Sequence, residues 1–130
     1  MSVGILLITH DGIASAHRAV AERLLGHLAL AVGVFELDFD ALPEDALTQA
    51  SAALRKVDSG DGVLVLTGLY GASPSRLAQR VAQLGTPMRR VSGLALPMLL
   101  RVLNHAECTL DELARVAISG ARNGVVADDA

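Results

Sequence analysis

The chain has 130 residues and a net charge of −3 at pH 7, which suits one domain with a buried core and argues against binding a nucleic-acid backbone. Aromatic residues make up only 2% of it, so stacking on nucleic-acid bases is also excluded and we expect no nucleic-acid partner. The single cysteine, Cys108, excludes an internal disulfide and favours a cytoplasmic protein. Neither a leader peptide nor a spanning apolar run is evident, so any membrane association would be peripheral.

The first half of the chain alternates strand patterns with helix patterns. Residues 3–9 (VGILLIT) form a continuous apolar run that predicts a strand covered on both faces. Residues 13–28 carry apolar side chains at helical spacing, and residues 32–40 alternate as in a strand nearer a sheet edge. Pro43 and the acids after it start a helix that is predicted to run to about Val57.

The second half repeats this alternation. Residues 62–67 (GVLVLT) predict a second fully apolar strand, and a helix follows the loop GLYGASPS and ends before Gly85. Three further elements are expected: a short strand over 89–96, an apolar turn or helix over 97–105, and a helix from the N-cap Thr109 to about Arg122. The tail after this helix is expected to be frayed.

This order of elements predicts the fold class. Strands that alternate with helices through short connections imply right-handed crossovers and a mostly parallel sheet. We therefore expect an α/β fold in which an open, mostly parallel sheet is sandwiched between helices, with residues 1–130 forming a single domain.

Two loops have a composition that points to a site. They are Thr9–Gly12, after the first strand, and Thr67–Pro74, after the third. Sites in such sheets lie beyond the carboxyl ends of the strands. Because a helix follows each loop, both are expected to turn free backbone N–H groups toward the same rim and to form a cradle for an anion such as a phosphoryl group.

His10 is the candidate nucleophile at this rim. A neutral imidazole is abundant at pH 7, and its nitrogen attacks phosphorus readily. The local sequence leaves open the alternative that His10 is an ordinary loop histidine. The other three histidines, His17, His27 and His105, share no metal-ligand spacing and no CxxC or HExxH motif occurs, so neither a metal nor a cofactor is expected.

The glycine-rich loop has two further interpretations. GLYGASPS matches neither GxGxxG nor the P-loop pattern, so a flavodoxin-like nucleotide or cofactor binder rests on fold analogy alone. Ser73 and Ser75 are possible nucleophiles, but the nucleophile-elbow pattern is missing. Ser73, which precedes Pro74, is more naturally a helix N-cap whose hydroxyl touches a phosphoryl group.

Four segments together resemble a known family. ITHDGIA, LTGLYGASPSRLAQRV, SGLALPMLLRVL and ISGARNG are similar, in order and spacing, to the IIA component of the mannose (fructose-sorbose) class of the bacterial sugar phosphotransferase system. The resemblance implies a phosphotransferase that takes a phosphoryl group from the phosphocarrier HPr onto His10 and passes it to a histidine of a IIB domain. It also implies a cytoplasmic homodimer.

The same resemblance suggests the residues that support His10. Phosphoryl-binding or supporting roles are expected for Thr9, Thr67, Gly71, Ala72 and Ser73. This chain departs from the family motif at Gly68, where an aspartate is usual, and at Ala95, where an asparagine is usual. A carboxylate behind an imidazole fixes its tautomer, and glycine does not. Two hypotheses therefore stand: a phosphocarrier, and a regulatory binding module in which phosphotransfer is weakened or lost.

Overall fold

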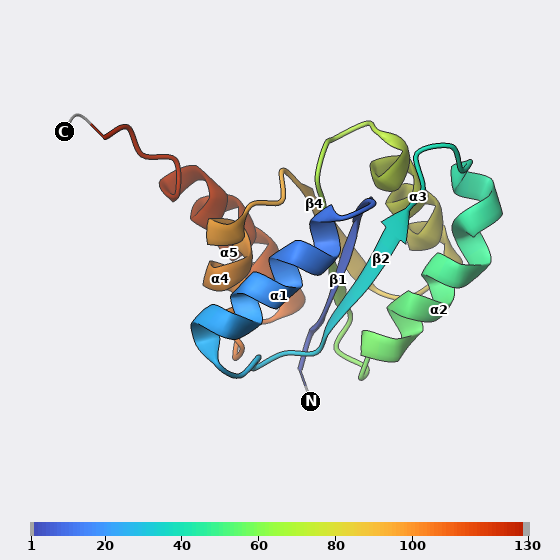
Figure 1. Ribbon diagram of the computed structural model, residues 1–130. Helices are drawn as coiled ribbons and strands as arrows, with labels where there is room; N and C mark the ends of the chain where they lie inside the picture. Colours follow the sequence, from blue (N-terminus) through green and yellow to red (C-terminus); the bar gives the residue numbers. More distant parts are fainter. Residues whose placement is uncertain (1, 129–130) are drawn as a thin grey trace.

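A computed structural model describes residues 2–128 and contains one four-stranded sheet, all of whose strands run parallel (Figure 1). The strands lie in the order β2-β1-β3-β4. Their bounds are Gly4–His10 for β1, Val32–Leu37 for β2, Val63–Thr67 for β3 and Met88–Ser92 for β4. The helices are α1 (Ile13–Leu25), α2 (Leu47–Val57), α3 (Ser73–Val81), α4 (Leu96–Leu103) and α5 (Leu110–Asn123), with 3₁₀ turns η1 (Pro43–Ala46) before α2 and η2 (Ala82–Leu84) after α3.

Helices cover both faces of this sheet, which confirms the predicted fold class (Figure 1). One face packs against α1, α4 and α5, and the other packs against α2 and α3. The central strands β1 and β3 are buried on both sides, which explains why their sequences are apolar without alternation. Successive residues point to opposite faces, so Leu6 and Ile8 lie on the α2/α3 side while Ile5 and Leu7 lie on the other.

Several predicted elements were too long, and a glycine with positive φ explains the end of two of them. Helix α1 ends at Leu25 rather than at residue 28, because Gly26 adopts a left-handed φ of 76°. Strand β4 ends at Ser92 rather than at residue 96, because Gly93, with φ of 92°, turns the chain toward α4. Strand β2 ends at Leu37, and Phe39 beyond it is 72% exposed.

The strand register places the two candidate loops at one edge of the sheet. Ile8 pairs with Thr67, so His10 extends two residues beyond the end of β3 on the neighbouring strand. Alternation from Ile8 and Val65 puts the side chains of His10 and Thr67 on the same face, toward α2 and α3. The expectation that both loops share one rim is confirmed.

Candidate functional site

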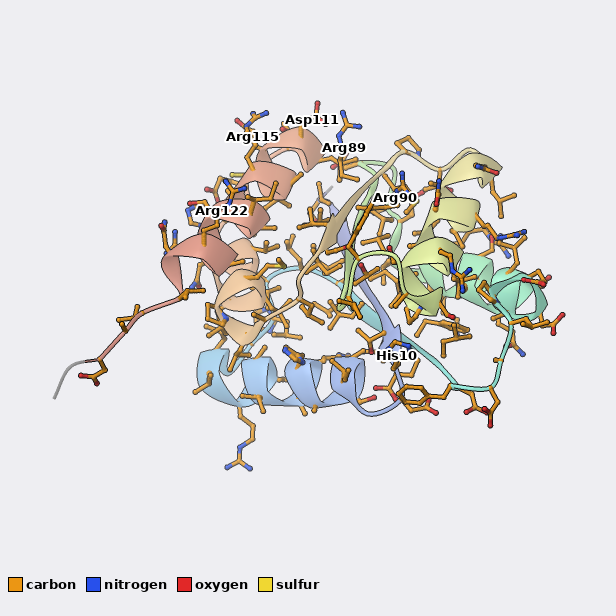
Figure 2. All side chains as sticks on the ribbon, turned by 90° about the horizontal axis from the view of Figure 1, so that it is seen from above. His10, Arg89, Arg90, Asp111, Arg115 and Arg122 are labelled. Atoms are coloured by element: carbon orange, nitrogen blue, oxygen red, sulfur yellow. The ribbon has the colours of Figure 1, made fainter. Side chains whose placement is uncertain are left out.

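His10 is the last residue of β1 and is partly exposed at the carboxyl end of the sheet (Figure 2). Its imidazole stacks on the ring of Phe39, with ring centroids 4.5 Å apart and an interplanar angle of 10°. Phe39 therefore restrains the imidazole plane from the β2 side. The ring is thus partly open to solvent and packed on one face by Phe39.

Thr9 shapes the turn that follows His10. Its hydroxyl donates to the His10 carbonyl oxygen at 2.8 Å and accepts from the Ala14 N–H at 2.9 Å. The side chain is 1% exposed, and Gly12 makes the turn into α1 with φ of 90°. Thr9 thus supports the histidine through the backbone; both of its bonds stay within the β1–α1 loop.

Glu36, on the neighbouring strand β2, closes the N-terminus of α1. One of its carboxylate oxygens accepts from the Ser15 N–H at 2.8 Å and from the Ser15 hydroxyl at 2.7 Å. Hydrogen bonds from the backbone of Gly12 and from Ser15 lower the pKa of this carboxyl below its ordinary value. A carboxylate at this end also opposes the positive end of the helix dipole.

This arrangement corrects the expectation that both loops offer free N–H groups. The N-terminus of α1 is already occupied by the chain's own carboxylate. Only the α3 side of the rim remains available to an external anion. Sequence reasoning missed Glu36 because its partner, Ser15, lies 21 residues away, although its position on the polar side of an edge strand was visible.

The β3–α3 loop has no such carboxylate. Gly71 makes the turn with φ of 87°, and the first turn of α3 contains no acidic residue. Pro74 has no N–H, so the open donors of this turn are the N–H groups of Ser73 and Ser75, which have no carbonyl partner within the helix. The Arg76 side chain points toward the N-terminus of α3, where its guanidinium donates to the Ser73 hydroxyl at 3.3 Å.

Two expectations about this loop are wrong in detail. Ala72, with an extended backbone, is the N-cap of α3, and Ser73 is the first helical residue. The Ala72 N–H is also engaged, because it donates to the Leu69 carbonyl oxygen at 3.2 Å. The open N–H donors of this loop are therefore those of Ser73 and Ser75 rather than that of Ala72.

Thr67 and Gly68 lie at the carboxyl end of β3, next to the end of β1 that carries His10. Thr67 is 1% exposed, and its hydroxyl shares a 2.8 Å hydrogen bond with the Ser92 hydroxyl. A Cβ built on Gly68 would meet no atom within 4 Å, and the backbone is not left-handed there. The space for a carboxylate side chain is present at Gly68. Ala95, the other departure, is the N-cap of α4 and has no side-chain oxygen with which to cap it.

The remaining histidines take no part in this constellation. His17 and His105 each bond through Nδ1 to a carbonyl one helical turn earlier, at 2.9 and 2.8 Å. Across residues 2–128 no group of three or more His, Cys, Asp or Glu side chains is arranged to hold a metal ion. Within that same range no helix is long and apolar enough to cross a membrane.

Comparison with known proteins decides the family. The family model for the PTS system fructose IIA component (EIIA-man) matches residues 4–117. The chain belongs to this EIIA-man family. The match runs from the start of β1 into α5, so it contains both loops of the rim.

Individual relatives of this EIIA-man protein agree with that assignment. The mannose-specific EIIAB component of Escherichia coli K12 is 30% identical over 129 residues, which are 98% of this chain and 40% of that relative. The chain thus spans about 40% of the curated relatives' length.

Solved structures show the same fold. The mannose/sorbose-specific IIA subunit from Enterococcus faecalis has a TM-score of 0.87 at 24% identity, with 100% of this chain and 97% of that one covered. The EIIA component from Streptococcus agalactiae has a TM-score of 0.82 at 21% identity, with 96% of each chain covered.

Proposed function

We propose that this EIIA-man protein is a phosphocarrier that holds a phosphoryl group on His10. It takes the group from an HPr-type protein and passes it to a histidine of a IIB protein or uses it as a regulatory signal. The observation that carries the proposal is the placement of His10 at the end of a central strand, on the same sheet face as Thr67, while α3 opens its N-terminus at the same edge.

The chemistry needs only a positioned nucleophile and charge stabilisation. A neutral ring nitrogen of His10 attacks the phosphorus, a nitrogen–phosphorus bond forms, and the bond from phosphorus to the donor's histidine nitrogen breaks with its electron pair leaving to the donor. The N–H groups of Ser73 and Ser75 and the Arg76 guanidinium then stabilise the phosphoryl oxygens. Thr9 and Phe39 hold the imidazole while this occurs.

The molecular setting follows from the same proposal. Residues 1–130 form a single EIIA-man domain that acts in the cytoplasm with an HPr-type donor and a IIB or regulatory acceptor. The protein acts as a homodimer, which is supported by two features of the chain. Strand β4 is a sheet edge, and Val125 and Val126 after α5 are 84% and 78% exposed, so the chain offers both an open strand edge and exposed apolar side chains.

The decisive experiment is reconstitution of the phosphorelay. Incubation with phosphoenolpyruvate, enzyme I and HPr should add one acid-labile phosphate per chain. His10→Ala should abolish the label completely, while the control His17→Ala should keep it, because the His17 ring is tied to the Ile13 carbonyl within α1. Label that survives His10→Ala, or wild-type protein that takes no label, would contradict the proposal. The regulatory binding module without phosphotransfer rests on the departure at Gly68 and is not better supported than the phosphocarrier.

A further inference from the structure

Phe39 is an aromatic side chain that lies outside the core. It is 72% exposed and belongs to neither of the two hydrophobic clusters that flank the sheet. The chain has only two Phe, one Tyr and no Trp, so it has few aromatic rings to place. The contact found for this ring is the stack on His10, with 4.5 Å between the ring centroids. Core packing therefore does not account for an aromatic ring at this position, whereas the contact with His10 does.

A short turn after β2 presents Phe39 to the histidine. The Ala41 N–H donates to the Asp38 carbonyl oxygen at 3.1 Å, which closes a turn that contains Phe39. Leu37 before the turn is 2% exposed and Pro43 after it is buried, so both ends of the segment are anchored in the protein. The backbone therefore fixes where the ring lies, although most of the ring's own surface is exposed.

No polar group shares the task of holding the imidazole. Within residues 2–128 no hydrogen bond or ion pair reaches a ring nitrogen of His10. The Glu36 carboxylate on the neighbouring strand is engaged by Ser15, and Gly68 at the end of β3 has no side chain. Among the residues that the structure describes, the stack with Phe39 is therefore the contact that restrains the imidazole.

We propose that Phe39 is the positioning residue of His10 in phosphoryl transfer, in the place of a carboxylate. This inference rests on the proposed function. Stacking fixes the plane of an imidazole, whereas a carboxylate bonded to one nitrogen also fixes which nitrogen points outward. Because an aromatic face contacts the imidazole equally well after a half-turn about the Cβ–Cγ bond, Phe39 sets the ring plane and does not fix the tautomer.

Fixing the plane is what aims the nucleophile. The attacking lone pair of an imidazole nitrogen lies in the ring plane, so that plane must contain the direction of the incoming phosphorus. Phe39 lies within 10° of parallel to the imidazole, so it covers a face of the ring and leaves the edge with the nitrogens clear. A protein that docks over His10 also covers the exposed side of Phe39, and the loss of water there strengthens the packing of the two rings.

The first test is the NMR spectrum of the free chain, which does not depend on phosphorylation. A ring stacked on an aromatic face is shielded, so the carbon-bound ring protons of His10 should resonate upfield of those of the exposed His27. Phe39→Leu should remove this shift, and Phe39→Tyr should keep it. Equal His10 shifts in wild type and Phe39→Leu would overturn the proposal.

The second test is rapid-quench labelling by phosphorylated HPr over a range of HPr concentrations. Phe39→Leu keeps an apolar side chain for the docking partner, so the half-saturating HPr concentration should change by less than about twofold. The saturating rate should fall about threefold, because the stack is lost. Phe39→Tyr should restore the rate, and the control Leu42→Ala, 55% exposed on the same segment, should not lower it.

The outcomes separate this proposal from the phosphocarrier itself. Wild type that takes no label contradicts the proposed function, whereas normal labelling with an equal saturating rate in Phe39→Leu overturns only the positioning role. In the Gly68→Asp background, where a carboxylate holds the ring, the loss caused by Phe39→Leu should shrink below about 1.5-fold. A full threefold loss in that background would mean that Phe39 acts through the docked partner and not through His10, and would overturn the proposal.

Discussion

The two loops at the rim of the sheet have the same topology and opposite electrostatics. Each connects the carboxyl end of a central strand to a helix, α1 in one case and α3 in the other. At α1, Glu36 supplies a permanent negative charge from within the chain. At α3 no carboxylate is present, and Arg76 lies over the first turn. One helix N-terminus is therefore filled and the other is open to an external anion.

The two loops therefore differ in role: the rigid β1–α1 loop is fixed by hydrogen bonds, and the receptive β3–α3 loop is open to an external anion. The β1–α1 loop is held by Thr9 and Glu36, and it follows His10, the nucleophile of the proposed function. The β3–α3 loop has no acidic residue in the first turn of its helix, and its side chains Leu69 and Tyr70 are 70% and 85% exposed. Four variants test whether this division of roles is real.

The largest effect is expected for Gly68→Asp. This change places a carboxylate on the β3–α3 loop directly after Thr67, in space that holds no atom within 4 Å of the new Cβ. The carboxylate should fix the imidazole tautomer and speed phosphorylation of His10 by HPr about tenfold or more. Rapid-quench labelling with phosphorylated HPr measures the rate.

Gly68→Asn is the matched control, because it has the same shape without the charge. It should leave the rate within about threefold of wild type, since an amide stabilises an imidazolium less than a carboxylate does. Equal rates for Gly68→Asp, Gly68→Asn and wild type would mean that the missing aspartate is not what limits this site.

Ser73→Asp gives the β3–α3 loop a carboxylate at its helix N-terminus, as Glu36 does for the β1–α1 loop. A carboxylate in the first turn of α3 should stabilise the helix, and it should also repel the phosphoryl group from the N–H groups of Ser73 and Ser75. We expect the phosphorylation rate to fall about tenfold while the unfolding free energy rises by about 0.5 kcal/mol. Ser73→Asn, which adds no charge, should change the rate far less; similar rates for both variants would remove the role assigned to this helix end.

Glu36→Gln is expected to act mainly on stability, and in a pH-dependent way. The pKa of Glu36 is lowered in the folded chain, so its contribution is fully present above the ordinary carboxyl pKa and is lost as pH falls through the folded value. Wild type should exceed Glu36→Gln by about 1 kcal/mol at pH 7 in urea unfolding, and the difference should shrink below about pH 4.5.

Glu22→Gln, an exposed change in the middle of α1, serves as the control for Glu36→Gln. It should shift stability by only a few tenths of a kcal/mol at either pH. A Glu36 difference that is the same at pH 7 and pH 3 would contradict the capping role of its carboxylate.

The sequence predicted the framework of this molecule well because strand and helix periodicities are local properties. The continuous apolar runs identified the two central strands, and the Thr109 capping box correctly marked the start of α5. The shared rim followed from the parallel topology, which brings the ends of β1 and β3 together.

The missing part of the prediction is the part that depends on contacts between distant segments. Glu36 closes α1 through strand pairing, and Phe39 reaches His10 from the chain after β2. Neither of these is encoded in a local motif. The one-residue error at Ser73 has another origin: serine before proline suits an N-cap, but Gly71 turns the chain early enough for Ala72 to take that position.

The smallest effect is expected at Phe39, which follows β2 and touches the histidine through packing alone. Phe39→Ala removes the ring stacked 4.5 Å from the His10 imidazole, and a stacked pair of this kind contributes about 0.5–1.5 kcal/mol. Phe39 is 72% exposed, so the lower end applies, and the phosphorylation rate should fall about threefold. Tyr70→Ala changes a more exposed aromatic, on the β3–α3 loop, for which no such stacking contact is found among the described residues, and it should leave the rate unchanged. Should Tyr70→Ala slow the reaction more than Phe39→Ala does, the imidazole would be oriented from the α3 side, and the assignment of a rigid and a receptive loop would have to be reversed.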